Sequence, residues 1–244
     1  MSEASPSFSE RYRALFNRRG SDWWSIVFGY PVARLLVVPL IPIKVITPTL
    51  LTLIGFACKL GAAWLLLSAD FEMVIAGAAL LQVCQVLDSM DGTLARARSE
   101  HSPLGAFLDK VTDGVGLFVL CLAVGLKALA VSGDPYALVA AAGAGGAFLM
   151  LCYMYWVAQG LAPPDDVQAH DGGAPVLSWS AIRREWLLGW TKIIRFAEAD
   201  LYLWIAVLAV LGQWRYLCFG LAASQIFTML KRAIDHGRRL ARPS

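Results

Sequence analysis

Long apolar segments alternate with short polar ones along most of this 244-residue chain. Six of the segments come close to the roughly 20 residues that a helix needs to cross the hydrocarbon core of a bilayer. They cover residues 47–68, 73–96, 103–127, 136–160, 190–211 and 214–232. The pattern therefore predicts an all-α integral membrane protein with six transmembrane helices.

Residues 23–46 precede the first of these segments and are also apolar, but their composition disfavours a seventh span. The segment contains three prolines and two cations: Pro31, Pro39, Pro42, Arg34 and Lys44. Proline interrupts the hydrogen bonds of a helix interior, and an amphipathic helix at the membrane surface tolerates such residues better than a span does. We therefore expect an N-terminal cytoplasmic segment with an interfacial helix over residues 1–46, a membrane domain over residues 47–236 and a basic tail over residues 237–244.

The composition supports a membrane protein and argues against several soluble classes. Hydrophobic residues make up 58% of the chain and charged residues 16%, whereas charged residues are about a quarter of an ordinary soluble domain. The net charge is only +3, so a nucleic-acid partner has little support. The five cysteines lie singly in apolar segments, which indicates neither a disulfide framework nor a zinc site.

Lysine and arginine are distributed unevenly between the two sides that six spans create. Short loops rich in these residues stay cytoplasmic. Nearly all of them fall on the side of the N-terminal segment, and only Lys127 and Arg215 clearly fall on the other. We expect both termini and the polar ends of the second and third spans to be cytoplasmic, in the plasma membrane or, in a bacterium, the inner membrane. The Pro-, Gly- and Asp-rich stretch 161–180 is expected to be a cytoplasmic linker.

Four acidic residues lie at or inside the ends of the second and third predicted spans. They are Asp88, Asp91, Asp109 and Asp113. One Asp at the bilayer centre costs about 2.5 to 3.5 kcal/mol on insertion scales. At about 100° per residue, the first two acids share one helix face, and the last two lie one turn apart on the next helix. Because the connecting turn is short, the helices are antiparallel neighbours, and we expect the four carboxylates to meet near the cytoplasmic end.

Carboxylates this close together cannot all ionise unless cations lie between them. Hard divalent ions such as Mg²⁺ take oxygen ligands, so the simplest interpretation is a metal site. Two ions held by carboxylates suit phosphoryl transfer, because they neutralise both the phosphate oxygens and the leaving group. Gly92 and Gly105 leave backbone exposed beside the acids, where a base or a diphosphate can approach. Arg96 has the forked guanidinium that binds phosphate oxygens in pairs.

The spacing of these residues, D-x2-D-G-x2-A-R-x8-G-x3-D-x3-D, resembles the signature of the CDP-alcohol phosphotransferases, also called CDP-alcohol phosphatidyltransferases. All eight signature positions are met, by Asp88, Asp91, Gly92, Ala95, Arg96, Gly105, Asp109 and Asp113. The preceding stretch Thr47 to Thr52 is similar to the family's TPN-x-x-T motif, with Thr49 where Asn is common. The resemblance implies an enzyme that transfers a substituted phosphate from a CDP-alcohol to a hydroxyl acceptor and releases CMP. It also implies two divalent metals, Mg²⁺ or Mn²⁺, and a homodimer.

The resemblance further implies a role for each signature residue. The four acids would ligate metal. Asp109 and Asp113 are the candidate catalytic residues, with Asp113 as general base on the acceptor hydroxyl. The nucleotide site would be lined by Gly92, Ala95, Arg96 and Gly105. Outside the signature, Arg195 is a candidate for contact with the acceptor or with a lipid phosphate, although the positive-inside bias alone also explains it.

The donor and acceptor are not specified by the signature. CDP-diacylglycerol with a small polar acceptor is favoured, in phospholipid biosynthesis, because an interfacial helix and a site at the membrane surface suit a lipid-anchored nucleotide. A soluble CDP-alcohol, such as CDP-choline, CDP-ethanolamine or CDP-inositol, acting on a lipid or polyol hydroxyl would use the same acids. Lys59 lies inside the first predicted span, and three explanations for it stay open from the sequence: a contact with a substrate phosphate, snorkelling to the interface, or pairing with a neighbouring acid.

Two other classes of protein also place acids in a membrane. An intramembrane prenyltransferase usually has a second acidic motif, and Asp165, Asp166 and Asp200 do not repeat the required spacing. A cation channel or transporter would use acids as an ion site. Such a protein would not require glycine, alanine and arginine at fixed distances from the acids, so both classes are disfavoured.

Overall fold

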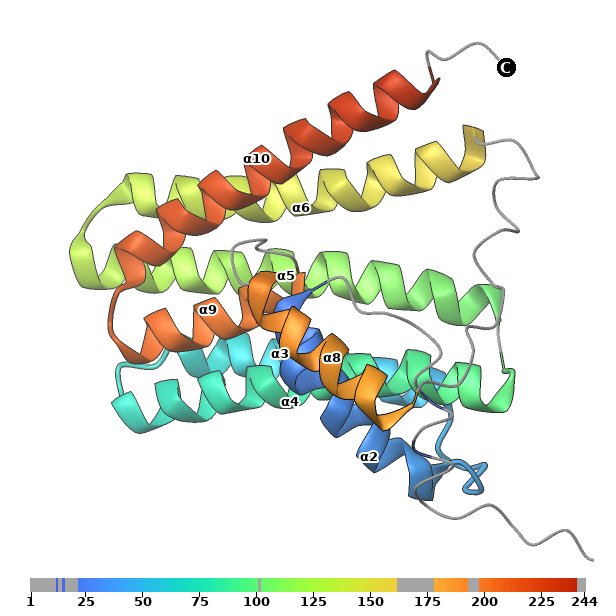
Figure 1. Cartoon of the computed structure of the whole chain (residues 1–244). Helices are drawn as coiled ribbons and strands as arrows, with labels where there is room; N and C mark the ends of the chain where they lie inside the picture. Colours follow the sequence, from blue (N-terminus) through green and yellow to red (C-terminus); the bar gives the residue numbers. More distant parts are fainter. Residues whose placement is uncertain are drawn as a thin grey trace, which may run out of the picture. The chain divides into compact units, whose positions relative to one another are not determined.

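The computed structural model describes residues 12, 15, 22–100, 102–161, 178–192 and 198–240. Within these residues the chain forms helices joined by short turns, and no strand (Figure 1). The helices are η1 (Ser25–Gly29), α2 (Tyr30–Leu40), α3 (Pro48–Leu66), α4 (Phe71–Arg98), α5 (Pro103–Ser132), α6 (Pro135–Leu161), α8 (Trp179–Gly189), η2 (Trp190–Lys192), α9 (Glu198–Val210) and α10 (Trp214–Leu240). The prediction of an all-α fold is confirmed.

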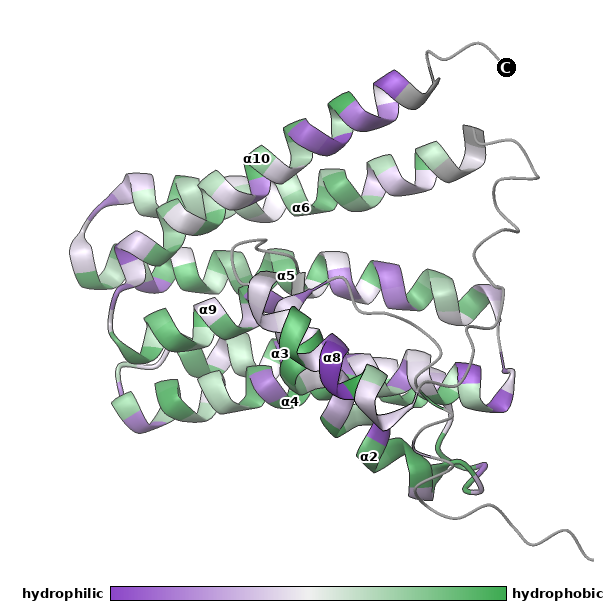
Figure 2. Cartoon of the chain, viewed as in Figure 1, coloured by the Kyte–Doolittle hydropathy of each residue, from purple (hydrophilic) through white to green (hydrophobic). Residues whose placement is uncertain are grey.

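Five of the described helices are long and apolar enough to cross a bilayer: α3, α4, α5, α6 and α10. Green, apolar positions dominate α3 and α6, whereas the C-terminal part of α10 carries many purple, polar ones (Figure 2). Large apolar side chains on these helices point outward, including Trp64, Val139 and Phe227, which are 77%, 67% and 70% exposed. Such surfaces are stable in lipid and costly in water, so the chain is an integral membrane protein.

The predicted span over residues 190–211 corresponds to a shorter helix. Residues Trp190–Lys192 form the 3₁₀-helix η2, residues 193–197 lie outside the described part of the chain, and α9 has 13 residues. At 1.5 Å per residue α9 is about 20 Å long, less than the roughly 30 Å of a hydrocarbon core. The number of six spans therefore stays a prediction.

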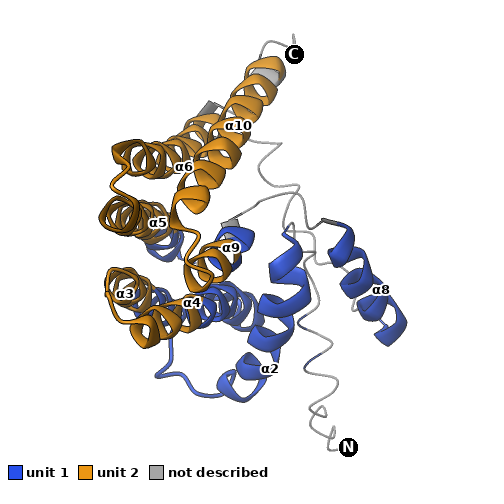
Figure 3. Ribbon diagram, turned by 90° about the vertical axis from the view of Figure 1, so that its left-hand side faces the viewer, with its two compact units in different colours: residues 1–55, 82–109, 172–203 blue, residues 56–81, 110–171, 204–244 orange. Residues whose placement is uncertain are grey.

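One compact unit comprises residues 1–55, 82–109 and 172–203 (Figure 3). Its apolar core joins α2, the start of α3 and the C-terminal half of α4, through Ala33, Val37, Val38, Leu51, Val86, Met90 and Leu94. On the opposite face of α2, Leu35 and Leu36 are exposed. The helix expected within residues 23–46 thus packs against the part of α4 that carries the first two signature acids.

The other unit comprises residues 56–81, 110–171 and 204–244. Within it α6 and α10 pack along each other, and α5 approaches α6 closely at two glycines (Figure 1). A Cβ at Gly125 would lie 2.8 Å from the Cβ of Ala141, and one at Gly145 would lie 2.8 Å from Cδ2 of Phe118. Small residues at such contacts let helices in lipid come close enough for van der Waals packing.

Candidate active site

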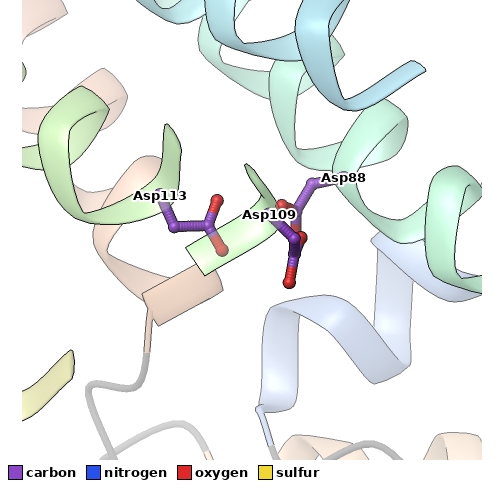
Figure 4. Close-up of side chains that lie close together, drawn as sticks. All are labelled: Asp88, Asp109 and Asp113. Atoms are coloured by element: carbon purple, nitrogen blue, oxygen red, sulfur yellow. The ribbon is translucent and has the colours of Figure 1, made fainter. Parts of the chain in front are cut away.

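Three of the four signature acids come together in the structure. One carboxylate oxygen from each of Asp88, Asp109 and Asp113 lies within 4.8 Å of the others (Figure 4). Asp88 projects from α4, and Asp109 and Asp113 project from successive turns of α5. The chain reverses direction between the end of α4 at Arg98 and the start of α5 at Pro103, so acids 21 residues apart in sequence (109 − 88) become neighbours (Figure 1). Three oxygen donors in one small volume form a set that a hard divalent cation prefers.

Asp91 lies one turn after Asp88 on α4 and is held by other partners. Thr52 Oγ1 donates a 2.5 Å hydrogen bond to Asp91 Oδ2, and the Gly92 backbone N–H donates to Asp91 Oδ1. Asp91 is 6% exposed and does not belong to the group of three close carboxylates among the described residues. Thr52 lies in the first turns of α3, and its contact with a signature acid was not predicted from the sequence.

The two signature glycines each leave room for a polar group of the protein itself. A Cβ at Gly92 would lie 3.1 Å from Arg96 Nη1, so the arginine side chain folds back over this glycine. Arg96 Nη2 donates to Thr93 Oγ1 at 3.3 Å. At Gly105 a Cβ would lie 2.9 Å from Ser102 Oγ, which accepts the Gly105 N–H and caps the start of α5. The carbonyl of Ala95, the fourth residue expected at the nucleotide site, accepts the Glu100 N–H at the end of α4.

Lys59 of α3 forms an ion pair with the last signature acid. Its Nζ lies 3.1 Å from Asp113 Oδ1, and both side chains are almost completely buried. Lys110, one turn before Asp113 on α5, places its Nζ 3.5 Å from Asp113 Oδ2, but its side chain is 37% exposed. Of the three explanations open from the sequence for Lys59, the structure contains the pairing with an acid.

Comparison with known proteins identifies the family of this carboxylate site. A family model described as CDP-alcohol phosphatidyltransferase matches residues 45–229, which is about three quarters of the chain. The chain belongs to this family.

The chain is also similar to the "Bifunctional IPC transferase and DIPP synthase" of Rubrobacter xylanophilus (strain DSM 9941 / JCM 11954 / NBRC 16129 / PRD-1). The two proteins are 37% identical over 94 residues, which are 37% of this chain and 21% of the relative. The chain thus matches about a fifth of the relative's length.

Arg98 holds the segment that leads from α2 into α3. Its guanidinium donates hydrogen bonds to four backbone carbonyls of the α2–α3 connection, those of Leu40, Ile41, Ile43 and Ile46, at 2.6, 3.0, 2.7 and 2.8 Å. The carbonyls of Leu40 and Ile43 also accept the backbone N–H groups of Ile43 and Ile46, so Arg98 adds to the local turns of this irregular connection. The sequence indicated only a cytoplasmic cation at this position.

A second arginine, Arg34 of α2, is buried next to the signature segment. Arg34 lies outside the five candidate spans, is 6% exposed, and stacks over the Tyr30 ring at 5.2 Å. The pKa of the Arg34 guanidinium is lowered to about 10, mainly by burial and in smaller part by the positive charge of Arg96. The guanidinium groups of Arg34 on α2 and Arg96 on α4 are therefore close enough to interact electrostatically, and two such positive charges favour the binding of an anion.

The remaining sequence predictions concern the stretch before α9. Arg195 and residues 162–177 of the expected linker lie outside the described residues. Asp200, considered above as part of a second acidic motif, is 0% exposed, and its Oδ1 accepts the Trp24 N–H at 3.0 Å. A carboxylate at the start of the Trp23–Leu40 helical stretch satisfies a free backbone N–H and the helix dipole, which explains this buried acid structurally.

Proposed function

We propose that this enzyme transfers a phosphatidyl group from CDP-diacylglycerol to the hydroxyl of a small polar acceptor and releases CMP, as a step of phospholipid biosynthesis. The observation that carries the proposal is the meeting of Asp88, Asp109 and Asp113 in a chain of this family. The proposed catalytic unit is the membrane domain of residues 47–236, acting as a homodimer, with its site and both termini on the cytoplasmic side.

The donor set fits two divalent cations, Mg²⁺ or Mn²⁺. Carboxylate oxygens within 4.8 Å of one another repel when ionised, and only cations relieve that repulsion without protonation. Asp91 would complete the ligands from α4, because each of its oxygens retains a lone pair beyond the bonds from Thr52 and Gly92. When bound, such ions neutralise the phosphate oxygens and the developing charge on CMP.

The side chains of the site divide the remaining tasks. Asp113 takes the proton of the acceptor hydroxyl as the acceptor oxygen bonds to phosphorus and the bond to the CMP oxygen breaks. Asp109 lies one turn earlier on the same face of α5, and its carboxylate is directed toward the phosphate. Arg96 donates to a phosphate oxygen after leaving Thr93, and Gly92, Ala95 and Gly105 border the nucleotide. The proposed role of Arg195 is to bind an anionic group of the acceptor or a lipid phosphate.

A lipid donor is favoured by the packing of α2. This helix lies against Val86, Met90 and Leu94 of α4, the segment that carries the signature, and exposes Leu35 and Leu36. An apolar outer face suits the depth of the acyl chains, so a nucleotide anchored by a lipid would reach the acids from the membrane surface. Soluble donors such as CDP-choline, CDP-ethanolamine or CDP-inositol, acting on a lipid or polyol hydroxyl, remain the second candidate because they use the same acids.

CMP release by purified enzyme in lipid nanodiscs tests the proposal. The donors are CDP-diacylglycerol, CDP-choline, CDP-ethanolamine and CDP-inositol, each with and without Mg²⁺ or Mn²⁺. We expect release only with metal, fastest with CDP-diacylglycerol. Asp113→Asn should lower kcat by about 10²-fold or more, the usual contribution of a general base, and Asp88→Asn and Asp109→Asn should also raise the metal concentration for half-maximal activity.

Asp134→Asn is the matched control for these variants. Asp134 forms a 2.8 Å ion pair with the exposed Arg215 and caps α6, a task that Asn performs equally well. Its kcat should stay within about threefold of the wild type. CMP release that needs no metal, or that survives Asp113→Asn, would refute the mechanism. Faster release from a soluble donor would refute the choice of CDP-diacylglycerol alone.

A further inference from the structure

The ion pair between Lys59 and Asp113 is buried, and the lysine side chain takes an unusual course to reach it. Lys59 lies twelve residues into α3, counting from Pro48, and its side chain is 4% exposed. A lysine so deep in a span is costly, and a flexible four-carbon side chain ordinarily extends toward the membrane surface. Here Nζ instead approaches Asp113 Oδ1 at 3.1 Å, and the Asp113 side chain is 8% exposed.

Gly116 on α5 provides the space that this contact needs. A Cβ at Gly116 would overlap Lys59 Cδ and lie 3.4 Å from both Cγ and Cε. The lysine stem therefore passes α5 at Gly116, three residues after Asp113, where the helix has no side chain. Any larger residue at position 116 would displace the stem and with it the ammonium group.

We propose that Lys59 is a positioning residue of the active site, which holds the Asp113 carboxylate in the orientation that the reaction needs and balances part of the acidic charge. The inference rests on the role of Asp113 given under the proposed function. Lys59 engages Oδ1 from within the bundle, which restricts rotation of the carboxylate that must accept the acceptor's proton. It does not touch the reacting atoms.

Removal of Lys59 should affect catalysis and metal binding in opposite directions. Without its ammonium partner, the buried Asp113 carboxylate loses its fixed orientation, so turnover falls. The same change removes a positive charge next to a divalent cation site, so cations are repelled less. A merely structural lysine would instead lower turnover, metal affinity and thermal stability together.

The experiment compares Lys59→Met and Lys59→Arg with the wild type in nanodiscs. CMP release gives kcat and KM for the donor, and the electron paramagnetic resonance signal of free Mn²⁺ gives the Kd of Mn²⁺ without any turnover. For Lys59→Met we expect kcat to fall about tenfold or more, KM to change less than about threefold, and the Mn²⁺ Kd to fall about threefold or more. Lys59→Arg keeps the charge and should restore the Mn²⁺ Kd and part of kcat.

One further variant tests the geometry. Gly116→Ala displaces the Lys59 stem and should shift kcat in the same direction as Lys59→Met. As a control, Lys231→Met removes an exposed lysine of α10 and should leave both kcat and the Mn²⁺ Kd within about threefold of the wild type.

The proposal is overturned if Lys59→Met keeps wild-type kcat, or if its Mn²⁺ Kd is unchanged or raised. It is also overturned if Gly116→Ala has no effect on kcat. Because the Mn²⁺ measurement needs no substrate, it separates this inference from the proposed function. A wild type that binds Mn²⁺ but releases no CMP from any donor contradicts the proposed function, while the change in Kd on replacing Lys59 still decides whether Lys59 acts on the acidic site.

Discussion

Arg98 illustrates how a single side chain replaces secondary structure next to the site. The α2–α3 connection is itself neither helix nor strand, so its carbonyls need partners from elsewhere. The Arg98 guanidinium supplies donors to four of them, and its side chain is only 6% exposed. Since the connection leads into α3, which carries Thr52 and Lys59, this network helps to fix the start of the helix that contacts two signature acids.

Arg98→Ala should lower the free energy of unfolding by about 2–3 kcal/mol, because four carbonyls, three of them in part-buried hydrogen bonds, lose a charged donor at once. Arg98→Lys should recover only part of this loss, since an ammonium group has three donors and no fork. Thermal unfolding in detergent, followed by circular dichroism, measures both. Arg232→Ala, which removes an exposed arginine of α10, is the control and should change stability by less than about 0.5 kcal/mol. Equal stability of Arg98→Ala and the wild type would contradict the assignment.

At the residue scale, the sequence predicted which acids lie close together better than it predicted which other side chains contact them. Asp88, Asp109 and Asp113 could be predicted to meet because helical periodicity and a short turn determine which side chains face each other. The contacts of Thr52 with Asp91 and of Lys59 with Asp113 join residues 39 and 54 positions apart. Such contacts depend on how whole helices pack, and no local pattern encodes them.

At the scale of elements, Pro31 explains an irregular stretch of helix and its contact with α8. Proline has no N–H, so residue 31 cannot donate to the Val27 carbonyl one turn earlier. The backbone before it, Ser25–Gly29, forms the π-helix η1, and the Val27 oxygen accepts the Trp186 Nε1–H of α8 at 3.0 Å instead. Gly189 of α8 packs closely on Ile26 and Val27, which brings the two elements together.

Trp186→Phe should lower the free energy of unfolding by about 0.5–1.5 kcal/mol, because it removes the donor and keeps an aromatic ring. Pro31→Ala returns a backbone N–H near Val27, so Trp186→Phe should cost less in that background. A double-mutant cycle on thermal stability measures the difference, with an expected coupling of about 0.5 kcal/mol or more. Additive effects would show that the Val27 carbonyl does not link the two residues.

Hydropathy predicted the long helices well and the amphipathic ones poorly. The predicted segment 103–127 corresponds to α5 (Pro103–Ser132), and the segment 136–160 corresponds to α6 (Pro135–Leu161). By contrast, α10 continues to Leu240, beyond its apolar part, and α8 was not recognised as a helix of its own. In both cases polar residues on one helix face lower the average hydropathy, although the backbone remains helical and Ser178 caps α8 by accepting the Ala181 N–H.

At the scale of the whole molecule, α4 defines the direction of the site across the membrane. It runs from Phe71 to Arg98, 28 residues, or about 42 Å at 1.5 Å per residue. A helix of this length and composition has its two ends on opposite sides of a bilayer. Asp88 lies about 15 Å of helix from Arg98, so the carboxylate site lies nearer the C-terminal end of α4 than its N-terminal end.

The positive-inside rule predicts that the C-terminal end of α4 faces the cytoplasm, because Arg96 and Arg98 end α4 whereas Asp70 and Glu72 flank its beginning. Cysteines introduced as Ala69→Cys and Glu100→Cys, each exposed, in a variant without the five native cysteines, report the two ends of α4. A membrane-impermeant maleimide added to intact bacterial cells should label position 69, and position 100 only after permeabilisation. The variants must first release CMP like the wild type, which verifies their fold. Labelling of position 100 in intact cells would place the carboxylates on the outer side, where the cytoplasmic supply of CDP-activated donors cannot reach them, and would contradict the proposed orientation.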